Sequence, residues 1–101
     1  MSNDEIAGLP DHPGALLRHR LAALNRPTAS IARMLVLSRQ TLHQIVAGKQ
    51  SITPAVALRI AKLTGTRAEM WLNLQQAHDL AIARSKLGDL LSKVPPLEER
   101  W

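Results

Sequence analysis

The sequence predicts an all-α domain of five or six short helices, and two observations support this. Of its 101 residues, 46% are hydrophobic but only 2% are aromatic, with no Phe, Tyr or Cys. A core built from Leu, Ile, Val, Ala and Met suits packed helices better than a sheet. In addition, apolar residues recur at helical spacing between Ser, Thr, Asn, Gly and Pro residues that start and stop helices.

Two short helices are expected in the first third of the chain. His12-Pro13-Gly14 opens the first helix, which continues with leucines at helical spacing as far as Leu24. Asn25 is expected to end it in a left-handed conformation, for which Asn is the second choice after Gly. The second helix is expected from about Thr28 to Met34.

The third helix has a start signal at one end and a stop signal at the other. Ser38 is a good N-cap, and Gly48 ends the helix after about Ala47. Leu35-Val36-Leu37 must therefore form a tight turn between the second and third helices.

The second half of the chain continues the helical pattern. Thr53-Pro54, a cap followed by Pro at the first helical position, starts a fourth helix that Gly65 ends. Thr66-Arg67-Ala68-Glu69 has the form of a capping box and starts a fifth. Gly88 could split this last helix into two, and Pro95-Pro96 closes it.

These elements are expected to form one domain with short tails. Residues 1–11 are interpreted as a flexible N-terminal tail, residues 12–94 as the helical domain with a C-terminal dimerisation segment, and residues 95–101 as a C-terminal tail. The N-terminal segment is acidic without an apolar run, so no signal peptide is expected, and no apolar run is long enough to span a bilayer. The absence of Cys fits a reducing cytosol. We expect a cytoplasmic protein without membrane contact.

Positive charge is concentrated in one part of the chain. The formal net charge is +5, but between Asp11 and Glu69 there are nine Lys and Arg residues and no acidic residue. Surfaces that only face solvent usually mix both signs. A purely cationic block indicates a polyanionic partner, most often nucleic acid, although charge alone does not separate DNA from RNA or an acidic protein. The nine cations are Arg18, Arg20, Arg26, Arg33, Arg39, Lys49, Arg59, Lys62 and Arg67.

The third helix, within the segment SRQTLHQIVAGK (residues 38–49), has the composition of a DNA-reading helix. Its apolar residues share one side, and its other face carries no carboxylate that phosphates would repel. Arg pairs with guanine and Gln with adenine when the first turns of a helix enter the major groove. A solvent-exposed surface helix could carry the same residues, but the short helix and tight turn before it favour a helix-turn-helix that binds double-stranded DNA. The expected base-reading residues are Arg39, Gln40, His43 and Gln44, and the expected phosphate or positioning residues are Thr28, Ser38, Thr41 and Lys49.

Catalytic and metal sites are not expected. The histidines are scattered and lack carboxylate or Cys companions at ligand spacing, so neither a metal nor a cofactor is predicted. Ser38 and Ser51 have no base beside them in the sequence and are interpreted as caps. No Gly-rich phosphate loop and no paired carboxylates occur, and we therefore expect no enzyme.

The fifth helix is where a two-fold contact is expected. Trp71 is of a type found more often in a core than at an interface. Specific operators, however, are usually read by dimers. The residues expected at the dimer contact are Trp71, Leu74 and His78.

The motifs together resemble a known family. SRQTLHQIVAGK is similar to the recognition helix of phage-repressor-like helix-turn-helix proteins. In combination with HPG at 12–14, SITP at 51–54 and WLNLQ at 71–75, it resembles the HigA-type antitoxins, also called virulence-associated protein I or addiction-module antidotes. The resemblance covers about residues 12–80. It implies a phage-repressor-like fold and a homodimer that represses its own operon and binds a RelE- or HigB-like mRNA-cleaving toxin.

Two positions depart from the pattern of this family. Val36 stands where the family commonly has Gly. If the resemblance implies a positive φ for Val36, the strain is about 1–2 kcal/mol, or the turn is reshaped. Pro27-Thr28 stands where the family often has Ser-Gln, whose Gln often contacts a phosphate. The residues after Leu80 leave the pattern as well. A phage- or plasmid-type repressor without a toxin partner is the alternative that the sequence leaves open.

Overall fold

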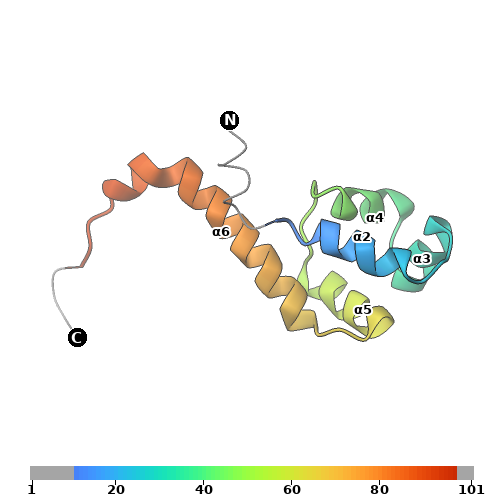
Figure 1. Cartoon of the computed structure of the whole chain (residues 1–101). Helices are drawn as coiled ribbons and strands as arrows, with labels where there is room; N and C mark the ends of the chain where they lie inside the picture. Colours follow the sequence, from blue (N-terminus) through green and yellow to red (C-terminus); the bar gives the residue numbers. More distant parts are fainter. Residues whose placement is uncertain (1–10, 98–101) are drawn as a thin grey trace.

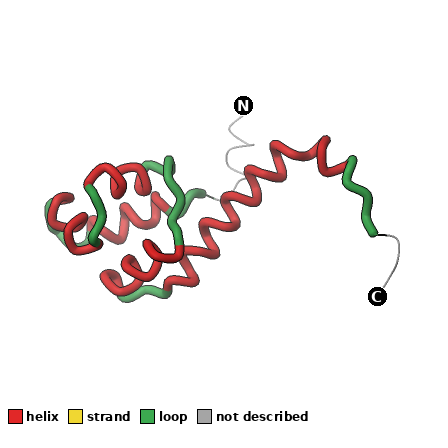
Figure 2. Tube along the Cα trace, turned by 180° about the vertical axis from the view of Figure 1, so that it is seen from behind, coloured by secondary structure: helices red, strands yellow, loops and turns green. Residues whose placement is uncertain are grey.

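The computed structural model describes residues 11–97, which fold into five helices without a strand (Figure 1). The helices are α2 (Gly14–Ala22), α3 (Thr28–Leu35), α4 (Arg39–Val46), α5 (Pro54–Thr64) and α6 (Ala68–Ser92). Helices α2 to α5 form a compact group, and α6 starts against this group and extends away from it (Figures 1 and 2). The all-α prediction is confirmed. The tail predicted for residues 1–11 lies, apart from Asp11, outside the described residues.

Local signals place most helix ends where the sequence predicts them. The hydroxyls of Ser38 and Thr53 cap α4 and α5 by accepting the N–H three residues further on, at 2.9 and 3.3 Å. Gly48 and Gly65 follow these helices with φ values of 77° and 73°. Asn25 has a φ of 53° after α2, which confirms its predicted left-handed conformation. Each of these ends depends on residues close in sequence.

The core lies where α2 to α5 meet the first turns of α6. Helix α3 packs against α4 and α5, α2 packs against α4, and α6 packs against α5. Helix α2 ends before Leu24, which nevertheless packs against the core. Helix α4 is therefore held against α2 and α3 through its apolar side. The buried hydrophobic residues are Leu17, Leu21, Ile31, Ala32, Leu35, Leu42, Ile45, Ile52, Val56, Ala57, Ile60, Ala68 and Trp71.

The SITP and WLNLQ motifs are joined by a buried hydrogen bond. Oε1 of Gln75 in α6 accepts the backbone N–H of Ile52 at 2.8 Å, and Nε2 of Gln75 donates to Asp79 at 3.0 Å. The fully buried Trp71 donates its indole N–H to the hydroxyl of Thr66 at 2.7 Å. A buried side-chain amide costs free energy unless it is hydrogen-bonded, and the buried amide of Gln75 is bonded through both its oxygen and its nitrogen. The two motifs thus fix α6 against the loop before α5.

One expectation about α6 is wrong, and one alternative that the sequence left open is decided. The helix has no capping box, because its N-cap residue is Arg67, which makes no side-chain cap bond. The hydroxyl of Thr66 accepts the indole hydrogen bond instead, and Glu69 pairs with Arg67 at 3.0 Å. Gly88 does not split the helix, which continues to Ser92. A single Gly costs a helix only about 1 kcal/mol relative to Ala, which is too little to end it.

Candidate nucleic-acid interface

Helix α4 has two chemically different faces. Leu42 and Ile45 are 3% and 0% exposed and anchor the helix in the core. The face turned to solvent carries polar and cationic side chains and no carboxylate. All four predicted base-reading residues lie outside the core, with Arg39, Gln40 and His43 exposed and Gln44 half-buried.

The residues predicted to contact or position phosphates lie around the ends of α3 and α4. Thr28 is exposed at the start of α3, and Lys49 is exposed just beyond α4. The other two cap the recognition helix: Oγ of Ser38 accepts the N–H of Thr41 at 2.9 Å and donates to Oγ1 of Thr41 at 2.8 Å. Ser38 and Thr41 therefore have an evident structural role in starting α4.

The turn between α3 and α4 contains a strained valine. Val36 has φ 55° and ψ 45°, a left-handed conformation that disfavours β-branched side chains, and its side chain is 77% exposed. Nη1 of Arg59 in α5 donates to the carbonyl of Val36 at 3.0 Å and to that of Leu35 at 3.4 Å. A cation is favourable at a helix C-terminus, where carbonyls lack partners. Arg59, which sequence reasoning assigned only to the cationic block, therefore stabilises the turn.

The HPG motif packs the start of α2 directly against the end of α4. A Cβ at Gly14 would clash with the carbonyl oxygen of Ile45, so only glycine permits this approach. Nδ1 of His12 accepts the N–H of Gly14 at 2.9 Å. The glycine and the histidine thus fix the position of the recognition helix relative to α2.

His12 is in an environment that disfavours its charged form. Its ring meets that of His78 edge-on, with 5.1 Å between the ring centroids. Its Nε2 is buried and has no hydrogen-bond partner among the described residues. Burial, followed by the proximity of His78, lowers the pKa of His12 below the ordinary value of 6.5. Within residues 11–97, no three His, Asp or Glu side chains gather as a possible metal site.

The cations of the acid-free interval are available to a polyanion. Eight of the nine are exposed, and Arg59 is half-buried. Among residues 11–97, the one ion pair joins Arg67 to Glu69. The other eight cations therefore have no carboxylate partner in the described part of the chain, as contacts to DNA phosphates require.

The residues predicted for the dimer contact differ in their positions. Trp71 is 0% exposed, so the core interpretation is confirmed and this side chain has no surface to offer a partner. Leu74 and His78 are half-buried on α6. Further along the same helix, leucines are exposed, among them Leu87 and Leu90.

No helix within residues 11–97 is both long and apolar enough to cross a membrane.

Two short helices joined by a tight turn, with a carboxylate-free second helix, define a helix-turn-helix domain. The family pattern described as "Helix-turn-helix" matches residues 17–71, and the chain belongs to this family of DNA-binding regulators, whose members are not enzymes. The chain is 34% identical over 71 residues to the HTH-type transcriptional regulator YddM of Escherichia coli, covering 70% of this chain and 76% of the relative. It is 36% identical over 73 residues to virulence-associated protein I of Dichelobacter nodosus, covering 71% and 68%.

Within this family the chain is similar to the HigA-type antitoxins, as the joint motifs predict. An addiction module antidote protein of the HigA family from Coxiella burnetii superimposes with a TM-score of 0.79 at 38% identity, covering 88% of this chain and 99% of that one. Antitoxin HigA of Pseudomonas aeruginosa, solved with the higBA promoter, gives a TM-score of 0.79 at 33% identity, covering 87% and 98%. The structures match along nearly the whole described chain.

Proposed function

We propose that this protein is the antitoxin of a toxin–antitoxin module, which binds its own operator as a homodimer and neutralises a RelE-like mRNA-cleaving toxin. The observation that carries the DNA-binding part is the exposed, carboxylate-free face of α4 in a helix-turn-helix. The similarity to HigA of P. aeruginosa, which was solved with a promoter, supports DNA as the partner.

The first turns of α4 would enter the major groove of the operator. Gln40 and Gln44 are four residues apart and therefore stack on one side of the helix, where Gln can bond adenine and Arg39 can bond guanine. The exposed cations, Lys49 among them, would neutralise phosphates and release counterions. Affinity for the operator should then fall steeply with salt.

A salt titration tests this proposal. For a dimer making ~6–10 phosphate contacts, affinity for its own promoter should fall on the order of 10³-fold or more between about 50 and about 200 mM salt. Lys49→Ala should weaken binding to every DNA sequence alike and make the salt dependence shallower. An affinity that did not change with salt would contradict the DNA-binding function.

The homodimer is proposed to form through α6. Beside Leu74 and His78, the outer part of this helix exposes Leu80 (41%), Leu87 (40%) and Leu90 (56%). A helix segment that projects without packing is only marginally stable in water, so a second copy covering these leucines would stabilise it. Dimerisation would also present two recognition helices to a two-fold symmetric operator.

Sedimentation of leucine variants tests the dimer. Leu87→Asp should convert a dimer to a monomer, whereas Leu58→Asp, on α5 and 65% exposed, should leave the dimer intact. The thermal midpoint of each variant shows that it is folded. A Leu87→Asp protein that sedimented as a dimer would contradict the proposed interface.

The toxin is proposed to bind away from the recognition helix. A basic toxin would be repelled by the cationic block, so acidic or apolar surfaces suit it better. These are the N-terminal segment with Asp4, Glu5 and Asp11, of which the first two lie outside the described residues, and the terminal helices.

Co-expression with the product of the neighbouring gene tests this part. The two proteins should copurify, and this chain should restore growth that the neighbour alone arrests. Gln40→Ala should lose repression and keep neutralisation. If that variant remained folded and dimeric but lost both activities, the proposal that DNA and toxin bind to separate surfaces would be wrong. If the neighbour arrested no growth, the alternative of a repressor without a toxin partner would be favoured.

A further inference from the structure

We propose that a groove beside α4 holds a sugar-phosphate strand of the bound DNA and that Arg18 binds a phosphate there. This inference rests on the proposed DNA-binding function, because the occupant is the operator itself. The groove has a volume of about 330 Å³ and lies between α2, the start of α3 and α4. It assigns a specific contact to α2, which carries Arg18 and Arg20 of the cationic block but none of the residues singled out for base reading or phosphate positioning.

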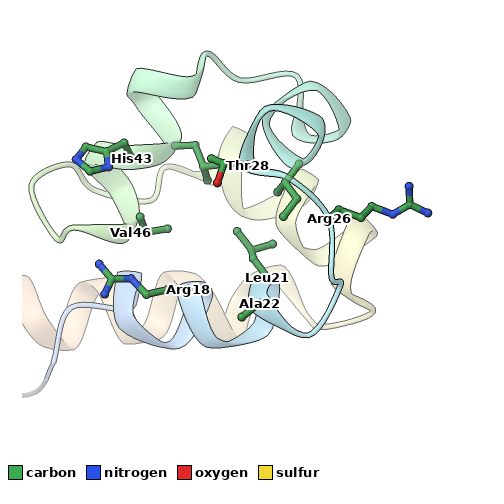
Figure 3. A pocket seen from close by; sticks show the side chains of 9 residues that line it. Arg18, Leu21, Ala22, Arg26, Thr28, His43 and Val46 are labelled. Atoms are coloured by element: carbon green, nitrogen blue, oxygen red, sulfur yellow. The ribbon is translucent and has the colours of Figure 1, made fainter.

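The groove combines an apolar floor with cationic and polar edges. Leu21, Leu42 and Val46 are among the apolar residues that line it, and no acidic residue lines it. Arg18 of α2 and His43 of α4 lie at one end, on either side of Val46 (Figure 3). Thr28 lies along the edge formed by α3 (Figure 3).

Arg18 has no evident structural role. Its side chain is exposed and makes no hydrogen bond or ion pair with any described residue. In this respect it differs from Arg59, which bonds the carbonyls of the turn, and from Arg67, which pairs with Glu69. An unpaired guanidinium at the same end of the groove as His43, a predicted DNA-contacting residue, suits a bidentate contact to phosphate.

The position of the groove favours a DNA strand over a small anion. Thr28 and His43, both predicted from the sequence to contact DNA, line the groove, so it continues the face of α4. A backbone that passes α4 would place deoxyribose carbons over the apolar floor and a phosphate within reach of Arg18. Such a contact positions the protein on the duplex without reading bases.

Arg18→Gln, with Arg20→Gln as the matched control, tests the proposal. Arg20 lies on the same helix and is exposed, but it does not line the groove. For a dimer, Arg18→Gln should reduce the slope of log affinity against log salt by about two, since each lost phosphate contact removes about 0.9. It should weaken binding to operator and random DNA equally, and Arg20→Gln should change neither by as much.

The outcomes separate this inference from the proposed function. If the wild-type protein binds its operator with the expected salt dependence but Arg18→Gln behaves like Arg20→Gln, the groove does not hold the strand, and DNA binding through α4 stands. If Arg18→Gln changes preference among operator variants, Arg18 reads bases and the phosphate assignment is wrong. Titration of the free protein with inorganic phosphate should give no saturable change in the NMR signal of His43. Saturable binding would make a free anion the occupant and overturn the proposal.

Discussion

The two halves of α6 have the same secondary structure but different surroundings. In the first half, Ala68, Trp71 and Gln75 are buried and join α6 to α5 and the loop before it. After Gln75 no residue of the helix is buried, and the helix projects beyond the compact group (Figure 2). The first half therefore holds the helix-turn-helix together, whereas the second half leaves its side chains exposed, and we propose that a second copy covers them. An added methyl group should therefore lower the stability of the fold in the compact region and raise it in the projecting part of α6.

Two glycines give the largest contrast between the compact region and the projecting helix. Gly14→Ala should destabilise the fold by about 1–3 kcal/mol, because the new methyl group meets the backbone of α4. Gly88→Ala should stabilise it by about 0.5–1 kcal/mol, because nothing lies within 4 Å of the added carbon and Ala is the better helix former. Urea unfolding of both variants measures the difference. A Gly14→Ala protein as stable as the wild type would show that α2 does not approach α4 so closely.

The strained turn makes a smaller contribution within the compact region. Val36→Gly should raise the free energy of unfolding by about 1 kcal/mol, because the left-handed conformation no longer opposes a β-branched side chain that is mostly exposed. The thermal midpoint should rise by several degrees. Arg59→Met should lower it by removing the guanidinium that bonds the carbonyl of Val36. A drop in the Val36→Gly midpoint would mean that the valine packs usefully in the folded protein.

The smallest expected effect is a dependence of stability on pH at His12. Because the folded state lowers the pKa of this histidine below 6.5, the unfolded chain binds more protons once the pH falls through that value. The stability contribution is complete above about pH 6.5 and is lost below it. His12→Asn, which keeps an acceptor for the N–H of Gly14, should therefore show a smaller fall in thermal midpoint between about pH 7.5 and about pH 5.5. His19→Gln, an exposed change on α2, should fall as the wild type does.

The sequence predicts local features of this fold better than contacts between distant segments. Caps such as Ser38 and stops such as Gly48 act over a few residues, so α3 to α5 have nearly the predicted ends. The sequence left the φ of Val36 open between two alternatives, because Arg59, which supports the left-handed turn, lies 23 residues away. The missing capping box has the same origin, since the indole of Trp71 occupies the hydroxyl of Thr66.

In the candidate site, too, the sequence predicts what depends on one helix better than what depends on several. The outward residues of α4 follow from helical periodicity and one apolar face, so the predicted base-reading residues lie together outside the core. The groove at Arg18 could not be predicted, because residues of three helices form it. The only sequence signal for it was the acid-free interval, which indicates a cationic surface larger than α4 alone. Leucines on the outer part of α6 were visible in the sequence, but their exposure depends on where the compact group ends.

Base reading by α4 is the central proposal for this protein, and Gln40→Ala measures it most directly. Affinity should be determined at one salt concentration for the operator and for random DNA of equal length. If Gln40 reads a base edge, the variant should lose about 1–3 kcal/mol on the operator, should bind random DNA nearly as the wild type does, and should tolerate other bases at one position of each half-site. Equal losses on both DNAs would show that α4 contacts only the backbone, which contradicts the account.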